Sequence, residues 1–156
     1  TQQVTQVLAE SYLSAERLEL EVTESAIMHE PDKAIRDMAG FRAMGVKLAV
    51  DDFGTGYSSL AYLNRLPLDR LKIDRSFVQD IGEDPGDEAI CRAVINLARS
   101  LGLETVAEGV EREEQARFLR KEGCDIGQGY LYSKPITAAE LFEQWRGKDV
   151  LDIARG

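Results

Sequence analysis

The chain has 156 residues, of which 44% are hydrophobic and 30% are charged, as in an ordinary globular protein. Its formal net charge of −9 argues against binding to nucleic-acid polymers, and no run approaches the ~20 apolar residues of a membrane span, so we expect no membrane contact. Cys91 and Cys124 are isolated and lack metal or redox spacing, so we expect reduced thiols and a cytoplasmic protein.

Amphipathic segments with helical spacing alternate with short runs rich in β-branched residues. A first helix is predicted within the first twelve residues, a first strand at 18–22 and a second helix at 32–44. Further strands are predicted at 47–50, 70–73 and 104–107, with a weaker one at 126–131, and further helices at 86–101, 112–122 and 137–146. Glycines directly follow three of these helices and are typical stop signals.

This alternation, repeated every ~25–30 residues, indicates an α/β fold with parallel strands joined by right-handed crossovers. No low-complexity linker divides residues 1–156, so a single domain is predicted. About five strands are too few for a closed barrel, which has eight. We therefore expect either an open α/β sheet or a partial (β/α)8 TIM-like barrel whose amino-terminal strands are missing.

Ionisable and amide side chains stand at the carboxyl end of every predicted strand. Parallel strands in such a fold end at one common face, where sites form, so these side chains are expected to gather there. In chain order they are Glu21, Glu24, Asp51, Asp52, Lys72, Asp74, Glu108 and Gln128. One acid at a strand end means little, but a series over consecutive strands predicts a functional site.

Several carboxylates held together need a counter-charge, because their mutual repulsion and desolvation cost several kcal/mol. Lys72 supplies one positive charge and cannot balance four or five acids. One or two Mg²⁺ or Mn²⁺ ions would do so, since hard cations prefer oxygen ligands. The alternative is that individual acids, Glu24 and Asp74 above all, cap the helices that follow them.

A glycine-containing loop follows the two adjacent aspartates. Gly54, Thr55 and Gly56 lie in a segment of small residues that can approach the phosphate or backbone of a ligand closely. The Asp-Phe-Gly triplet at 52–54 also occurs in protein kinases, but the other kinase motifs are absent from the sequence. A kinase is therefore excluded.

Five segments together resemble the EAL domain, a bacterial signalling module that hydrolyses cyclic di-GMP. They are LELEVTES at 18–25, DDFGTGYSSL at 51–60, LKIDRSF at 71–77, VAEGVE at 106–111, and GCD at 123–125 leading to QGYL at 128–131. The resemblance covers essentially the whole chain, and the DDFGTGYSS segment is highly specific. It implies a variant (β/α)8 barrel that converts cyclic di-GMP to linear pGpG.

The resemblance also implies roles for the strand-end residues. Glu21, Asp51, Asp52 and Glu108 resemble metal ligands, with Asp51 bridging two ions ~3.5–4 Å apart that together activate a water. Glu108 is in addition a candidate general base, and Lys72 resembles the residue that steadies the attacking water or the phosphate.

The remaining residues have supporting roles by the same resemblance. Glu24 is similar to the residue that holds the loop after Asp52, and Gln128 to one that lines the site. Gly54, Thr55, Gly56 and Asp74 belong to the segments that bind substrate or support the loop.

The Glu-Ala-Leu motif that names the family is expected to precede Thr1, together with a strand that carries an asparagine ligand. Residues 1–156 are therefore interpreted as a truncated EAL domain that is inactive or weak by itself. Its open strand edges make a homodimer plausible, and the resemblance implies a sensory or GGDEF domain in the parent protein. Two alternatives remain: a non-catalytic module that binds cyclic di-GMP or a protein, and a barrel with an enolase-like metal site, which leaves the DDFGTGYSS loop unexplained.

Overall fold

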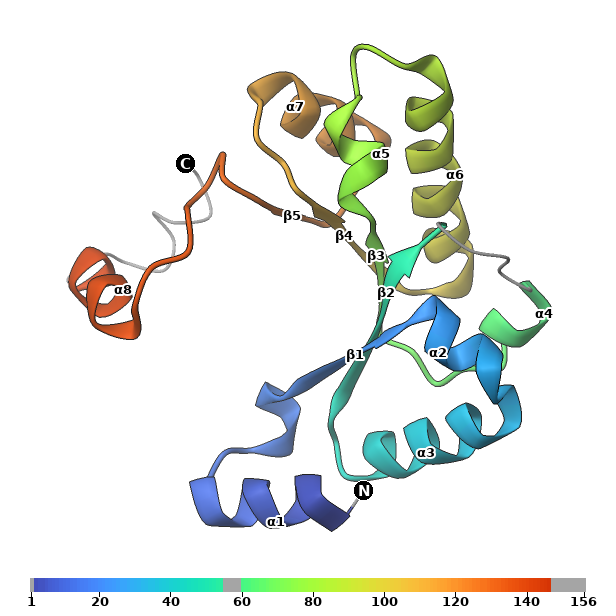
Figure 1. Cartoon of the computed structure of the whole chain (residues 1–156), viewed down its shortest axis with the longest axis vertical. Helices are drawn as coiled ribbons and strands as arrows, with labels where there is room; N and C mark the ends of the chain where they lie inside the picture. The colour runs from blue at the N-terminus through green and yellow to red at the C-terminus, as the bar shows by residue number, and fades with distance from the viewer. Residues whose placement is uncertain (1, 55–59, 147–156) are drawn as a thin grey trace.

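The computed structural model of the chain describes residues 2–54 and 60–146 (Figure 1). Within them a five-stranded sheet has the order β1-β2-β3-β4-β5, and each strand is parallel to its neighbour. The strands are β1 (Glu19–Thr23), β2 (Lys47–Phe53), β3 (Arg70–Ile73), β4 (Glu104–Glu108) and β5 (Ile126–Gln128). Spatial order follows chain order without the reversal of a doubly wound sheet, as in a segment of a (β/α)8 barrel.

The five predicted helices are confirmed, with small shifts of their ends. They are α1 (Gln2–Ser11), α3 (Pro31–Ala43), α6 (Pro85–Leu101), α7 (Glu113–Glu122) and α8 (Ala138–Trp145). Four short elements were not predicted: η1 (Ala15–Arg17), α2 (Glu24–His29), α4 (Leu60–Leu63) and α5 (Arg75–Gln79). The weak strand predicted over 126–131 ends at Gln128, because the chain turns at Gly129.

The ends of the longest helix follow from its sequence. Asp84 caps α6 by accepting a hydrogen bond from the backbone N–H of Gly86, and Pro85 occupies the first helical turn, where its missing N–H costs nothing. Gly102 ends the helix in the left-handed conformation, with φ of 70°. Loop geometry is thus specified locally at both ends of α6.

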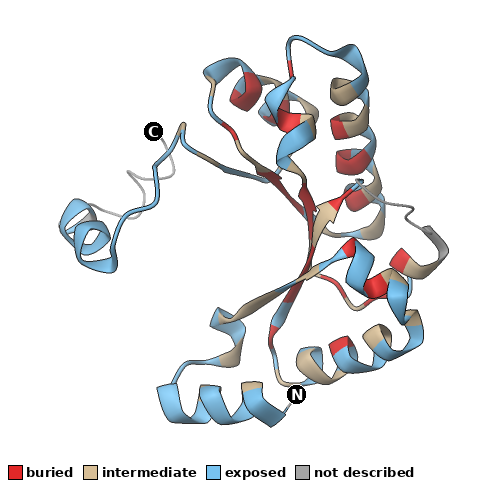
Figure 2. Ribbon diagram, in the orientation of Figure 1, coloured by how far each residue is buried: buried red, intermediate tan, exposed pale blue. Residues whose placement is uncertain are grey.

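The core lies between the central strands and the helices that cover one side of the sheet. Leu48, Leu71 and Ile73 are fully buried and pack in one cluster with Ile95 and Ala98 of α6. Figure 2 shows the buried residues concentrated in the middle strands and on the inner sides of α6 and α7. The core therefore holds β2, β3 and β4 rigidly, and these are the strands that carry Asp51, Lys72 and Glu108.

Both ends of the described chain are poorly covered. α1 contains no buried residue, every residue of β5 is exposed, and α8 stands apart from the sheet in Figure 1. The exposed large hydrophobic residues gather in these two regions: Val7, Tyr12 and Leu13 in the first, and Ile126, Tyr130, Tyr132, Ile136, Leu141 and Phe142 in the second. None of the described helices has the length and apolar character that crossing a membrane requires.

Candidate active site

The carboxyl ends of the strands bring the predicted residues to one edge of the sheet. Thr23, which ends β1, lies opposite Asp51 of β2, and Glu108 of β4 lies opposite Gln128 of β5. Lys72 comes from β3, between β2 and β4. Strand pairing thus places side chains that are far apart in the sequence next to one another, as the sequence pattern predicts.

An irregularity in β2 separates the two adjacent aspartates. Val50 pairs with Leu71 and Phe53 pairs with Ile73, so β2 has one more residue than β3 over this stretch. Such a bulge changes the direction of side chains that would otherwise alternate between the two faces. Asp52 has φ of 55°, in the left-handed region that costs a residue with a Cβ about 1 kcal/mol or more.

Lys72 lies at the centre of the carboxylates. Its Nζ is 2.6 Å from Glu108 Oε1, 2.7 Å from Glu21 Oε2 and 3.1 Å from Asp51 Oδ1, and its side chain is only 5% exposed. Burial by itself lowers the pKa of Lys72, but the hydrogen bonds to Glu108, Glu21 and Asp51 outweigh it and raise the pKa above its ordinary value. The ammonium group therefore stays charged and donates to carboxylates from three strands.

Asp52 and Asp74 form a second acidic contact beside this cluster. Burial, followed by the nearby charges of Asp51 and Asp74, raises the pKa of Asp52. Asp74 shows the opposite shift: burial opposes it, but hydrogen bonds from Ser76 hold its pKa below the usual range. Asp74 also caps α5 by accepting from the backbone N–H of Ser76 at 2.9 Å, so for this residue the helix-capping alternative is confirmed.

Glu24 reaches the loop after β2 instead of capping its own helix. Its side chain accepts a hydrogen bond from the backbone N–H of Gly54 at 3.1 Å, whereas Thr23 caps α2. Glu24 is 3% exposed, and its Oε1 has no hydrogen-bond partner among the described residues. Gly54 has φ of 98°, which suits glycine. Thr55 and Gly56 lie outside the described residues.

The rim next to Glu108 contains side chains that the sequence reasoning did not single out. A shallow hollow is lined by Gln128, Glu108, Arg75, Glu111 and Tyr130, together with two glycines. Arg75 follows the capping residue Asp74, and its guanidinium pairs with Glu111 at 3.0 Å. Both residues lie in the segments by which the family resemblance was identified. Their position just after strand ends is the sequence feature that could have marked them as site residues.

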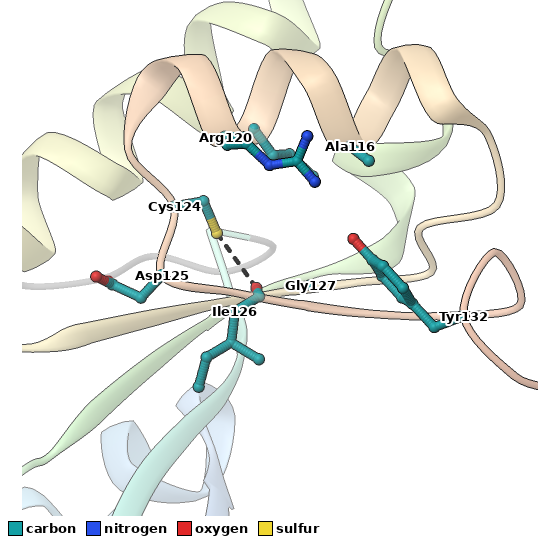
Figure 3. Close-up of a pocket in the computed structure, with 8 residues that line it drawn as sticks. Ala116, Arg120, Cys124, Asp125, Ile126, Gly127 and Tyr132 are labelled. Carbon is teal, nitrogen blue, oxygen red and sulfur yellow. Dashed lines mark hydrogen bonds between the residues drawn. The ribbon is translucent and has the colours of Figure 1, made fainter. Parts of the chain in front are cut away.

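A separate pocket lies between α7 and β5, away from the carboxylates (Figure 3). Arg120 and Tyr132 extend into it from opposite sides, and Cys124 lies close by with its Sγ 3.3 Å from the carbonyl oxygen of Ile126. None of the predicted site residues lines this pocket. Both cysteines are free thiols, as expected, and burial raises the pKa of Cys91 to about 12, so Cys91 behaves as a small buried hydrophobic residue.

The donor set at the strand ends fits a hard divalent cation. Glu21, Asp51, Asp52 and Glu108 offer only carboxylate oxygens, which Mg²⁺ and Mn²⁺ prefer, and they outnumber the one ammonium group of Lys72. Burial first, and then the charges of Asp51 and Asp74, raise the pKa of Asp52, and a bound cation would offset both effects. The side chains of the described part of the chain do not group three or more potential ligands around one point, since Lys72 stands between them.

A protein-family model described as the EAL domain matches residues 1–135. The cyclic di-GMP phosphodiesterase NbdA of Pseudomonas aeruginosa is 51% identical over 141 residues, which make up 90% of this chain and 18% of NbdA. MucR of the same bacterium, a bifunctional diguanylate cyclase and cyclic di-GMP phosphodiesterase, is 46% identical over 138 residues, or 88% of this chain and 20% of MucR. The chain thus spans about a fifth of the length of these relatives.

Solved structures show the same fold. The MucR phosphodiesterase in complex with cyclic di-GMP matches with a TM-score of 0.86 at 46% identity, covering 88% of this chain and 56% of the MucR chain. BlrP1 of Klebsiella pneumoniae, in a complex with manganese and cyclic di-GMP, matches with a TM-score of 0.78 at 35% identity. That match covers 85% of this chain and 34% of the BlrP1 chain.

Proposed function

The chain belongs to the EAL domain family, and from this premise we propose that its strand-end residues take part in the metal-dependent hydrolysis of cyclic di-GMP to linear pGpG. The observation that carries the proposal is the convergence of Glu21, Asp51 and Glu108 on Lys72, from four consecutive parallel strands. Residues 1–156 are then the later part of a phosphodiesterase domain. A place in the cytoplasm, where cyclic di-GMP is made and degraded, accords with this activity.

The carboxylates of Glu21, Asp51, Asp52 and Glu108 would hold one or two Mg²⁺ or Mn²⁺ ions. Bound divalent cations lower the pKa of a water and stabilise the charge that develops at phosphorus. The reaction adds water to one phosphodiester: an oxygen–phosphorus bond forms, the bond from phosphorus to the 3′ oxygen breaks, and that oxygen takes up a proton. One ring ester opens, and the product is linear pGpG with a 5′ phosphate.

The other residues act by donating hydrogen bonds, accepting protons or fixing loops. Lys72 is kept protonated by its raised pKa and donates to a phosphate oxygen or orients the attacking water. Glu108 accepts the proton of that water. Glu24 holds the backbone of Gly54, and the amide of Gln128 faces the ligand at the rim. Each role rests on the position of the residue at the carboxyl edge of the sheet.

A second candidate is a module that binds cyclic di-GMP without hydrolysing it. The observation in its favour is that Lys72 separates the carboxylates of the described residues, so they are not grouped as a metal site. The chain also covers 56% of the MucR phosphodiesterase chain that it matches, and we expect turnover to need the rest of the domain.

The test uses two proteins: the chain itself, and a hybrid domain in which the amino-terminal part of the MucR phosphodiesterase domain precedes this chain. Cyclic di-GMP binding is measured by calorimetry, and pGpG formation by chromatography, with Mg²⁺, Mn²⁺ or EDTA. We expect metal-dependent turnover by the hybrid domain and little or none by the chain alone. E108Q should abolish turnover, whereas D32N, which changes an exposed carboxylate paired with Arg65, should not.

The outcomes separate the two candidates. A hybrid domain that binds cyclic di-GMP but yields no pGpG with any metal would favour the binding module. A hybrid domain that neither binds nor hydrolyses cyclic di-GMP would overturn both candidates.

A further inference from the structure

The loop that follows Glu108 is held firmly on one side. Glu108 ends β4, and Gly109 turns the chain with φ of 70°. On the β5 side, the backbone N–H of Val110 donates to Gln128, and the Val110 carbonyl accepts from Leu131, both at 3.0 Å. These backbone bonds fix the loop to its neighbouring strand, but they do not connect it to β3, which carries Lys72.

On the β3 side, the loop is held by side chains, and Arg75 is central to this contact. A Cβ atom placed on Gly109 would overlap with Cγ of Arg75 and lie 2.9 Å from its Cδ. The alkyl chain of Arg75 therefore lies directly against Gly109. The guanidinium continues to Glu111, with Nη2 3.0 Å from Oε1. Gly109 thus leaves the space that Arg75 needs to cross from α5 to the loop.

Two glutamines complete this brace. With its amide oxygen turned towards Arg75, Gln79 of α5 accepts from Nε and Nη2 at 2.8 Å each. Gln115 is 2% exposed, and its Oε1 accepts from the backbone N–H groups of Glu111 and Arg112 at 2.8 Å each, while its Nε2 donates to the Gln79 carbonyl at 3.1 Å. Arg75 and the two glutamines therefore join α5 to the loop in one hydrogen-bonded network.

We propose that Arg75 is a positioning residue, which sets Glu108 against Lys72 by bracing the loop 109–111 to the carboxyl end of β3. This brace keeps the proton-accepting carboxylate of Glu108 aligned with the reacting water, a role that rests on the proposed function. The distance that depends on the brace is the 2.6 Å between Lys72 Nζ and Glu108 Oε1. Small displacements of a catalytic group cost large factors in rate.

The first test does not depend on catalysis. Amide hydrogen exchange is measured by mass spectrometry in the chain itself and in its R75A and R92A variants. R92A is the matched control, because Arg92 also joins two elements through paired carboxylates but lies on α6, away from the site. We expect faster exchange at residues 109–112 in R75A and unchanged exchange there in R92A. Unchanged exchange in R75A would overturn the brace.

The second test uses the hybrid domain and separates positioning from contact with the ligand. In R75A we expect kcat to fall about tenfold, while the Kd for cyclic di-GMP, measured with Ca²⁺, stays within about twofold. R75K should recover most of kcat, and R75M, which keeps the alkyl chain without the charge, should lie between R75A and the wild type. A rise in Kd with unchanged kcat would overturn the proposal and make Arg75 a ligand contact instead.

A double-mutant cycle checks that Arg75 acts through Gly109. G109A should lower kcat in the wild-type background, because the added Cβ displaces Arg75. In the R75A background the same substitution should cost less, since the overlap with Cγ and Cδ is removed and only the contact with Cβ of residue 75 at 3.0 Å and the backbone strain at residue 109 remain. Additive effects of the two substitutions would overturn the mechanism. An inactive wild-type hybrid domain would contradict the proposed function. Amide exchange in the chain alone would then decide whether Arg75 braces the loop.

Discussion

The ammonium group of Lys72 serves the fold as well as the proposed chemistry. It lies within 3.1 Å of three carboxylates, so its removal leaves their charges uncompensated. We expect K72M to lower the free energy of unfolding by about 2 kcal/mol in EDTA, discounted because the carboxylates are partly exposed. Adding Mg²⁺ should reduce the difference in unfolding free energy between the wild type and K72M. Urea unfolding measures both values, and K33M, at an exposed lysine paired with Glu30, is the control that should show no measurable change.

The pH dependence of this contribution follows from the direction of the shift. The pKa of Lys72 is raised in the folded state above its ordinary value of 10.5. The stabilisation is therefore fully present below pH 10.5 and is lost only as the pH rises further, through the folded-state pKa. The difference in unfolding free energy between wild type and K72M should stay constant from pH 7 to 9. A difference that shrinks over that range would contradict the assigned charge state.

Asp52 has a backbone conformation that is unfavourable for a residue with a Cβ, and its surroundings are unfavourable for an ionised carboxylate. Its φ is 55°, and burial together with Asp51 and Asp74 raises its pKa, so the folded state disfavours its ionised form. At pH 7 we expect D52G in EDTA to be at least as stable as the wild type and up to about 1 kcal/mol more stable, while metal binding is lost. Chemical unfolding and metal titration measure the two effects.

The neighbouring aspartate supplies the control for this substitution. Asp51 hydrogen-bonds to Lys72 at 3.1 Å, so D51G should destabilise the chain. Equal losses of stability in D51G and D52G would show that the positive φ at Asp52 stores no strain.

At the scale of elements, the sequence predicts what depends on local pattern. All five strands and the five longer helices follow from hydrophobic spacing and stop signals. The short helices α2 and α5 span six and five residues, too few to show an amphipathic period. The cap of α5, Asp74, was interpreted as a site residue, and the cap of α2, Thr23, was not singled out. β2 extends to Phe53 because the bulge continues its pairing past the aspartates, a tertiary effect that no local pattern encodes.

The candidate site was predictable as a set of strand ends but not as a geometry. Parallel strands dictate that Asp51, Lys72 and Glu108 meet at one edge. Two features are seen only in the structure. One is the position of Lys72 between the carboxylates, which follows from the strand order, and the other is the crossing of Arg75 over Gly109. Both depend on contacts between residues more than 20 positions apart, which periodicity does not reveal.

Helix termination at Gly102 gives a prediction at this scale. Gly102 has φ of 70°, and a Cβ there would meet no atom within 4 Å, so G102A introduces backbone strain without a clash. We expect G102A to cost about 1 kcal/mol of unfolding free energy. G123A should cost more, because Gly123 has φ of 88° and its Cβ would also displace Arg99. A neutral G102A in urea unfolding would show that the left-handed end of α6 is not a constraint.

At the scale of the whole molecule, β5 is an edge strand, since the described residues contain no further strand beside it. Every residue of β5 is exposed, and Ile126 is 37% exposed. Unpaired strand edges promote association between copies, and a charge placed on an edge prevents it. We propose that the chain alone forms dimers through this edge, and we expect I126K to shift sedimentation towards the monomer. I136K, at a residue of equal exposure outside the sheet, should not. Association unaffected by I126K would place the contact elsewhere.

The uninterrupted succession of the strands has a consequence for how the chain is made. Each described strand after β1 pairs with the strand that precedes it, so a chain emerging from the ribosome adds one strand and its helix to a sheet that is already present. Pairs that are close along the chain cost little loop-closure entropy, which favours rapid assembly. Folding can therefore proceed during synthesis, because each strand can pair with the edge of the sheet as soon as it has been synthesised.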